Sequence, residues 1–211
     1  MKLLRVFACM WVVSGLATAG EYDDAISAAL PGYRIVQPSE RWIPVYSHLP
    51  KAPDVFKKER EAPAVIVGRF NEDEYRDFAA YILDPAAKRR TEPLPPSFPD
   101  GVDAYSGGLV VCFGQKGGRY RCQRPVPQMD KVLLPHGWYL EHIPPGKLKC
   151  RGLQRIRPWE PLGSERRQEY LGEDKTISIT TDALGWWPIL GAGGGIMVFQ
   201  PDGSYLDCSF H

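Results

Sequence analysis

Hydrophobic residues in this chain form short runs separated by polar turn residues, a pattern typical of β-strands. Val65–Val67 and Phe78–Leu83 are two such runs, and Thr176–Thr180 alternates with a period of two. The chain also has 21 glycines and 20 prolines, which favour short strands and tight turns over long helices. We therefore predict a mainly β (α+β) fold, built as an antiparallel sheet of short strands.

One short helix is expected near the N-terminus, over residues 21–30. Apolar residues recur there at helical spacing, and Asp23 and Asp24 favour the positive end of a helix. Pro31 and Gly32 follow directly and end the helix. A proline-rich, charged stretch over residues 84–100 predicts an exposed connection between two neighbouring strands of one sheet.

The first 19 residues have the form of a secretory signal peptide. Lys2 and Arg5 precede an apolar run over residues 6–13, and Ala17–Ala19 fits a small-residue cleavage site. Cleavage before Gly20 would leave a single β-rich domain over residues 20–211. We therefore expect a periplasmic or secreted protein. No membrane span is expected, because no apolar run approaches the ~20 residues that a span requires.

The cysteines predict two disulfides. Loss of Cys9 with the leader leaves an even number in an oxidising compartment, and their spacing fits no zinc pattern: Cys112, Cys122, Cys150 and Cys208. A hairpin centred on Gly117 places Cys112 directly opposite Cys122, within disulfide reach. By elimination Cys150 pairs with Cys208, which ties the last strand to the middle of the chain.

An acidic loop separates the two apolar runs of residues 64–83. It carries five carboxylate or amide side chains: Asn71, Glu72, Asp73, Glu74 and Asp77. Six positions match the calcium loop of integrin-type FG-GAP (VCBS-like) repeats, roughly G-D-F-N-G-D-G-x-x-D-hydrophobic: Gly68, Phe70, Asn71, Asp73, Asp77 and Phe78. The segment resembles one such repeat, which implies a propeller-like arrangement and calcium held by Asn71, Asp73 and Asp77.

The loop also departs from that family pattern. Arg69 replaces the first acidic ligand, and Glu72 and Glu74 replace two glycines. We therefore expect the strand-loop-strand shape to survive and the metal site to be degenerate. Three interpretations stay open: a solvated acidic loop, a loop that binds calcium through Glu72 or Glu74, and an acidic loop that contacts a partner.

A second candidate contact surface lies near the C-terminus. Trp186 and Trp187 precede the glycine-rich stretch Gly191–Gly195. Adjacent residues in a strand point to opposite faces, so one indole is a candidate for exposure and for gripping a protein partner or a sugar. Core packing of both indoles is the alternative. The glycine-rich stretch lacks the lysine and the following helix of a phosphate-binding loop.

Charge and motifs exclude several function classes. The formal net charge is only +1, which does not suggest nucleic-acid binding. The sequence has no G-x-S-x-G, no H-E-x-x-H and no cysteine left over as a nucleophile.

The first hypothesis is a non-enzymatic periplasmic binding protein with an envelope protein as partner. Glu72, Glu74, Trp186 and Trp187 are the candidate partner-binding residues. Some exported bacterial proteins that resemble FG-GAP repeats are immunity proteins that block cell-wall hydrolases, which sharpens this hypothesis. The alternatives are a glycan or cell-wall hydrolase that uses carboxylates of loops 71–77 and 202–207, and a calcium-stabilised structural domain. No cofactor other than calcium is implied.

Overall fold

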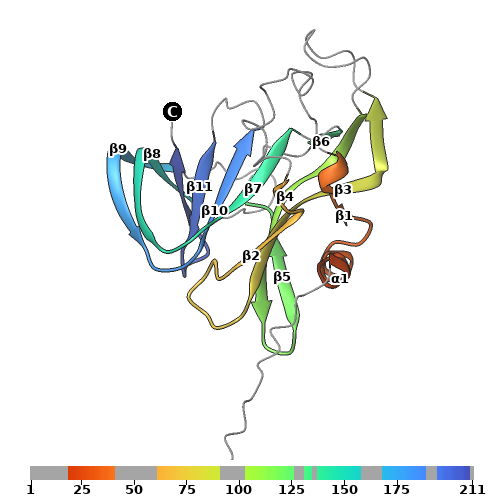
Figure 1. The fold of residues 1–211 in the computed structure, drawn as a ribbon, viewed down its shortest axis with the longest axis horizontal. Helices are drawn as coiled ribbons and strands as arrows, with labels where there is room; N and C mark the ends of the chain where they lie inside the picture. The colour runs from red at the N-terminus through yellow and green to blue at the C-terminus, as the bar shows by residue number, and fades with distance from the viewer. Residues whose placement is uncertain are drawn as a thin grey trace, which may run out of the picture.

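In its described part the protein forms two antiparallel β-sheets, the α-helix α1 (Ala19–Ala29) and a short 3-10 helix at Pro38–Glu40, as Figure 1 shows. The computed structural model describes residues 19–40, 61–90, 103–125, 131–134, 137–157, 168–188 and 194–209. This architecture confirms the mainly β prediction. The expectation of short strands was wrong for the strands Asp77–Arg90, Asp103–Gln115, Gly146–Ile156 and Gln168–Ile179, which are 14, 13, 11 and 12 residues long. The propeller-like arrangement that the FG-GAP resemblance implies is not seen, because the strands form two packed sheets.

The N-terminal sheet contains the first half of the strands. Its elements are β1 (Arg34–Ile35), β2 (Val65–Gly68), β3 (Asp77–Arg90), β4 (Asp103–Gln115), β5 (Arg119–Gln123) and β6 (Lys131–Leu134). The order is β1-β3-β4-β5, with β2 paired to β3 and β6 paired to β4. The predicted strand-loop-strand unit is therefore the β2–β3 hairpin, in which Val67 lies opposite Phe78.

The C-terminal sheet contains the remaining strands. Its elements are β7 (Trp138–Ile143), β8 (Gly146–Ile156), β9 (Gln168–Ile179), β10 (Ala183–Pro188), β11 (Gly195–Phe199) and β12 (Tyr205–Ser209). They pair in the order β7-β10-β11-β12-β8-β9. The last two strands, β11 and β12, form a hairpin in which Phe199 lies opposite Tyr205.

The main hydrophobic core lies between the two sheets. Alternate residues of β3 and β4 face residues of β7, β10, β11 and β12, so that each sheet buries one face against the other. Aromatic rings fill one end of this core. The ring of Phe199 lies 5.4 Å from that of Phe113 and 6.0 Å from that of Phe70, measured between centroids. Phe70, the first apolar residue after β2, is fully buried there.

Helix α1 (Ala19–Ala29) covers the opposite face of the N-terminal sheet (Figure 1). Tyr22 and Ile26 are buried against Phe78, and the ring centroids of Tyr22 and Phe78 are 4.7 Å apart. The helix begins two residues before the predicted start. Residues 1–18, on which the signal-peptide prediction depends, lie outside the described part of the chain. None of the described helices is long and apolar enough to cross a membrane.

Both predicted disulfides are present. Cys112 of β4 pairs with Cys122 of β5, directly opposite in the hairpin, with Cα atoms 3.9 Å apart. Cys150 of β8 pairs with Cys208 of β12, with Cα atoms 5.0 Å apart. Gly117 and Gly118 in the turn of the first hairpin have positive φ, which glycine adopts without strain. The turn therefore sets the register that brings Cys112 and Cys122 together.

One local prediction needs correction. The proline-rich stretch begins as strand, because β3 extends through Pro85 to Arg90 before the described chain stops. Its neighbour in the sheet is β4, as the sequence predicted for the strands on either side. The apolar runs within residues 132–143 belong to different sheets, since β6 joins the N-terminal sheet and β7 joins the C-terminal sheet. Residues 91–102 of the predicted connection lie outside the described residues.

Candidate functional site

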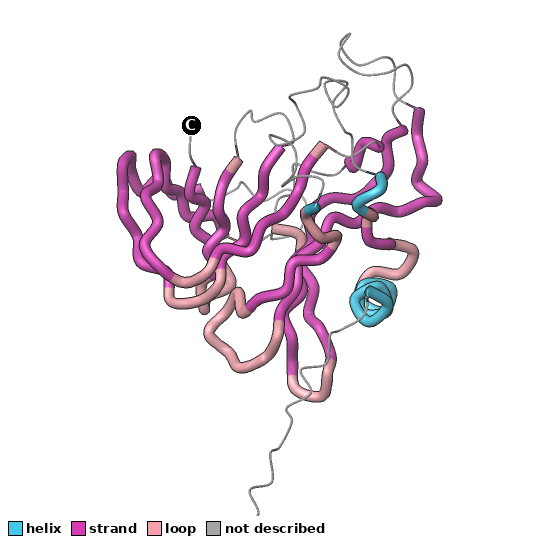
Figure 2. Tube along the Cα trace, viewed as in Figure 1, coloured by secondary structure: helices cyan, strands magenta, loops and turns pink. Residues whose placement is uncertain are grey.

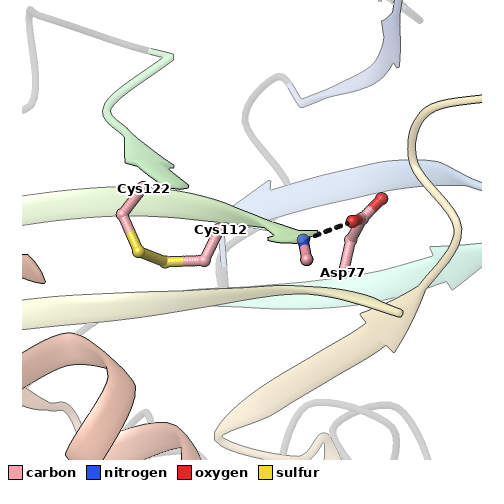
Figure 3. The surroundings of a disulfide bond; sticks show 4 residues. Asp77, Cys112 and Cys122 are labelled. Carbon is pink, nitrogen blue, oxygen red and sulfur yellow. Dashed lines mark hydrogen bonds between the residues drawn. A yellow bond between two sulfur atoms is a disulfide. The ribbon is translucent and has the colours of Figure 1, made fainter. Parts of the chain in front are cut away.

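The acidic loop, residues 69–76 between β2 and β3, projects from one end of the molecule (Figure 2). The carboxylate of Asp77, the first residue of β3, anchors the base of the loop through hydrogen bonds. One carboxylate oxygen accepts a hydrogen bond from the Phe70 amide at 2.8 Å and a longer one from the Asn71 amide at 3.3 Å. The other oxygen accepts from the Gly114 amide in β4 at 2.9 Å, the bond dashed in Figure 3. Asp77 thus ties the loop to the neighbouring hairpin.

Burial dominates the acidity of Asp77. The residue is 0% exposed, and desolvation raises its pKa from 3.8 to about 6. The three backbone donors favour the ionised form and lower the pKa, and nearby Asp73 raises it. A carboxylate in this position has no surface for a substrate. The hydrolase hypothesis needs carboxylates open to a cleft, and the enclosed carboxyl of Asp77 does not meet that need.

The tip of the acidic loop is folded by its own side chains. The Asn71 side-chain oxygen accepts from the Asp73 amide, and the Asp73 carboxylate accepts from the Tyr75 amide at 2.8 Å. The Asn71 side-chain nitrogen donates to the other oxygen of Asp73 at 2.8 Å. These are Asx-type turns, in which a short polar side chain replaces a backbone hydrogen bond. Glu72 and Glu74, between these turns, are exposed.

These hydrogen bonds bear on the calcium prediction. Both oxygens of Asp77 and of Asp73 accept hydrogen bonds from the chain itself, and Asp77 points inward. Within the described residues, no group of three or more His, Cys, Asp or Glu side chains is placed to hold a metal ion. Calcium would have to displace the hydrogen bonds around Asn71, Asp73 and Asp77. Calcium binding by the acidic loop stays a prediction.

Close packing fixes the base of the acidic loop. A Cβ atom added at Gly114 would lie 2.4 Å from the carbonyl oxygen of Arg76, and one at Gly68 would lie 2.9 Å from the ring of Phe70. Neither distance is tolerated between real atoms, so both glycines are needed where the loop crosses the sheet. The G-x-F spacing of the sequence therefore has a packing role here.

Asp182, a residue that sequence reasoning missed, joins the two sheets beside the acidic loop. It precedes β10, and its carboxylate accepts from the Arg69 amide at 2.7 Å while its own amide donates to the Arg69 carbonyl at 2.9 Å. The other carboxylate oxygen lies 3.0 Å from the His142 imidazole on β7. We call Asp182, Arg69 and His142 the latch. Spacing gave no sign of it, because its members are distant in sequence.

A basic hairpin lies next to the acidic loop at the same end of the molecule (Figure 2). We use this name for residues 115–121, the ends of β4 and β5 with their turn. Its cations are Lys116, Arg119 and Arg121. An open depression of about 330 Å³ separates the loop from the hairpin, lined by Asn71, Asp73, Tyr75, Phe113, Gly114, Gln115, Lys116, Arg119 and Arg121. This end of the molecule therefore presents the acidic loop beside the basic hairpin.

The two tryptophans lie in β10 and point to opposite faces, as expected for adjacent strand residues. Trp186 packs against the core between the sheets and stacks on Trp138, with ring centroids 5.3 Å apart. Trp187 packs near Tyr139 and Ala62, on the other side of the strand. Both indoles are partly buried, so neither is the freely exposed aromatic that the sequence allowed. Gly191–Gly193 lie outside the described residues.

The predicted partner-binding residues are thus not brought together. Glu72 and Glu74 stand exposed on the acidic loop, while Trp186 and Trp187 pack within and beside the C-terminal sheet. No family model, no curated protein and no solved structure matches this chain.

Proposed function

We propose that this protein is an exported, non-enzymatic binding protein whose acidic loop contacts a protein of the bacterial envelope. The specific form we propose is an immunity-type inhibitor, in which the loop enters the cleft of a cell-wall hydrolase. The proposal assigns the contact to Glu72, Asp73 and Glu74. It assigns no catalytic residue to this chain.

One observation carries the proposal: the acidic loop is internally hydrogen-bonded while its three acidic side chains face solvent. Asp77 and the Asx turns at Asn71 and Asp73 already order the backbone. Binding through a preorganised loop avoids most of the entropy cost of ordering it. The exposed carboxylates of Glu72, Asp73 and Glu74 then add electrostatic steering toward a basic partner surface.

The disulfides support the exported location. Cys112–Cys122 lies at this end of the molecule, in the strand pair whose Gly114 amide donates a hydrogen bond to Asp77 (Figure 3). Cys150–Cys208 joins two strands of the other sheet. Bonds of this kind persist in oxidising compartments such as the periplasm. A rigid, disulfide-bonded support is also what an inhibitory loop requires.

The test compares two charge-reversed variants. Glu72→Lys/Glu74→Lys reverses the loop, and Glu169→Lys/Glu173→Lys reverses two exposed acids on β9 as the matched control. The control breaks the surface ion pair of Glu169 with Arg155, which contributes little to stability. Oxidised protein from Gly20 onward is used to capture partners from an envelope extract, and bound proteins are identified by mass spectrometry.

We expect the native chain and the β9 control to retain the same dominant protein in stoichiometric yield, and the loop variant to lose it. The captured protein is then assayed on peptidoglycan with each variant added. Inhibition by the native chain and the β9 control, but not by the loop variant, supports the inhibitor form. Equal capture by all three proteins would remove the acidic loop as the contact surface.

A further inference from the structure

The basic hairpin beside the acidic loop carries positive charge that the described chain does not neutralise. Lys116, Arg119 and Arg121 are exposed. The ion pairs found among the described residues involve other cations. The guanidinium of Arg121 lies 6.0 Å from the centroid of the Phe113 ring, which holds it over the hairpin. Arg119 and Arg121 are two residues apart in β5, so their side chains project from the same face of the strand.

The acidic residue that lines the same depression as these cations is already hydrogen-bonded within its own loop. Asp73 lines the same depression, but its oxygens accept hydrogen bonds from the Tyr75 amide and the Asn71 side chain. Three cations thus line one side of an open depression of about 330 Å³. The depression is suited to carboxylates supplied by another molecule, since these would form charge-assisted hydrogen bonds with both arginines.

The backbone of β5 is also free to pair along one edge. In the described part of the chain β5 is the last strand of its sheet and pairs only with β4. Cys112 and Cys122 form a closely spaced pair with Cα atoms 3.9 Å apart, which is the spacing of a non-hydrogen-bonded pair. The amides of Arg119 and Arg121 therefore face β4, and the amides of Tyr120 and Cys122 face outward. The Gly114 amide bonds Asp77 instead of β5, which agrees with this alternation.

These features favour a peptide over a sugar. Phe113 is only 7% exposed, so it offers no open ring face on which a sugar would stack. An outward strand edge offers backbone donors and acceptors at the spacing of an extended peptide, and the disulfide holds that edge to β4. Charge complementarity adds a second requirement for the peptide. It needs acidic side chains at alternate positions, so that they face Arg119 and Arg121.

We propose that β5 binds an extended acidic peptide segment as an added strand, with its carboxylates on Arg119 and Arg121 and its backbone on Tyr120 and Cys122. This inference rests on the proposed function, because it describes a segment of a protein partner. It goes beyond that function by adding a second contact of opposite charge beside the acidic loop. A partner that presents a basic cleft and an acidic extended segment would engage both.

The first test is direct binding of a synthetic probe. The probe is a fluorescent peptide of about seven residues with alternating glutamate and valine, and its anisotropy is followed with the oxidised chain. We expect Arg119→Glu/Arg121→Glu to weaken binding by about tenfold or more, because two attractive contacts become repulsive. Lys147→Glu/Lys149→Glu is the matched control. These two exposed lysines alternate in β8 of the other sheet, where they lie opposite Ser178 and Thr176 of β9. Equal weakening in both variants would overturn the proposal.

The second test separates strand addition from simple charge attraction. Hydrogen exchange of the native chain is measured with and without the peptide, and we expect the Tyr120 and Cys122 amides to become protected. A peptide of the same sequence with alternate N-methylated amides should lose binding, since it cannot complete the strand pairing. Retained binding of the methylated peptide, or unprotected amides at saturation, would overturn strand addition. So would an oligogalacturonate that competes as well as the peptide, because it has no peptide backbone.

The two proposals fail in different ways. One outcome is that the peptide does not bind while Glu72→Lys/Glu74→Lys still loses the captured partner. The proposal for β5 is then wrong, and the proposed contact through the acidic loop is retained. The other outcome is that the peptide binds and Glu72→Lys/Glu74→Lys captures the partner as well as the native chain does. The acidic loop is then not the contact surface. The peptide measurement needs no extract, so it does not depend on the identity of the partner.

Discussion

The acidic loop and the tryptophan strand β10 are the two regions in which the sequence predicted partner contacts, and they fold in opposite ways. The acidic loop holds its backbone with internal polar groups and leaves Glu72 and Glu74 in solvent. Strand β10 instead packs Trp186 and Trp187 against apolar neighbours on its two faces. A loop is free for binding when its backbone is satisfied locally, whereas large apolar side chains in a strand are drawn into the nearest core.

The largest expected effect is the collapse of the acidic loop on removal of its anchor. Asp77→Ala leaves the buried amides of Phe70 and Gly114, and the partly buried amide of Asn71, without an acceptor. At ~1–3 kcal/mol for each unsatisfied buried group, we expect a loss of about 3 kcal/mol or more in the free energy of unfolding. Denaturant unfolding measures it. Asp77→Asn keeps the shape and one acceptor, so its loss should be clearly smaller. Equal stability of all three proteins would contradict the anchoring role.

The pH dependence of stability tests the same anchor. The pKa of Asp77 is about 6 in the folded chain against 3.8 for an unburied aspartate, so the folded state binds the proton more tightly. Protonation of Asp77 therefore adds to the free energy of unfolding. This contribution is complete below about pH 4 and is lost as the pH rises through about 6. The two-unit difference corresponds to about 3 kcal/mol. We expect the stability difference between native chain and Asp77→Asn to change across this window, in unfolding titrations at each pH. A flat difference would contradict the raised pKa.

Substitution of Trp186 in β10 should lower the stability of the protein and leave partner binding unchanged. Trp186→Ala removes a half-buried indole that stacks on Trp138, for which we expect a loss of about 2 kcal/mol. Because Trp186 packs inward, hydrogen exchange in the acidic loop and partner capture should be unchanged in folded protein. Trp186→Phe keeps an aromatic ring there and should restore part of the stability. Loss of partner capture with unchanged stability would show that the indole is itself a contact.

The latch connects the two regions, and its removal should have the smallest effect. Asp182→Ala removes the acceptor of the Arg69 amide and the partner of His142, at a partly exposed site. We expect a loss of about 1 kcal/mol. The matching local signal is faster hydrogen exchange of the Arg69 amide, with the amides bound to Asp77 unaffected. Exchange that accelerates over the whole acidic loop would mean that Asp182, and not Asp77, is the main anchor.

Sequence reasoning located the β2–β3 hairpin and the Cys112–Cys122 pair because both are local. Apolar runs mark the strands, and the turn around Gly117 fixes which residues stand opposite each other. It also named Asp77 but gave it the wrong surroundings. Asp77 was expected on an open loop, and the Gly114 amide that encloses it comes from a strand 37 residues further along.

The amino-acid sequence by itself determined the mainly β content, the N-terminal helix, the turn glycines and the disulfide partners, because periodicity and turn chemistry act over a few residues. Only the tertiary structure decided that β6 and β7 part into different sheets, that both tryptophans pack, and that Arg119 and Arg121 lie beside the acidic loop. Those outcomes depend on which apolar faces bury each other. That choice is made between segments far apart in the chain, and local pattern carries no information about it.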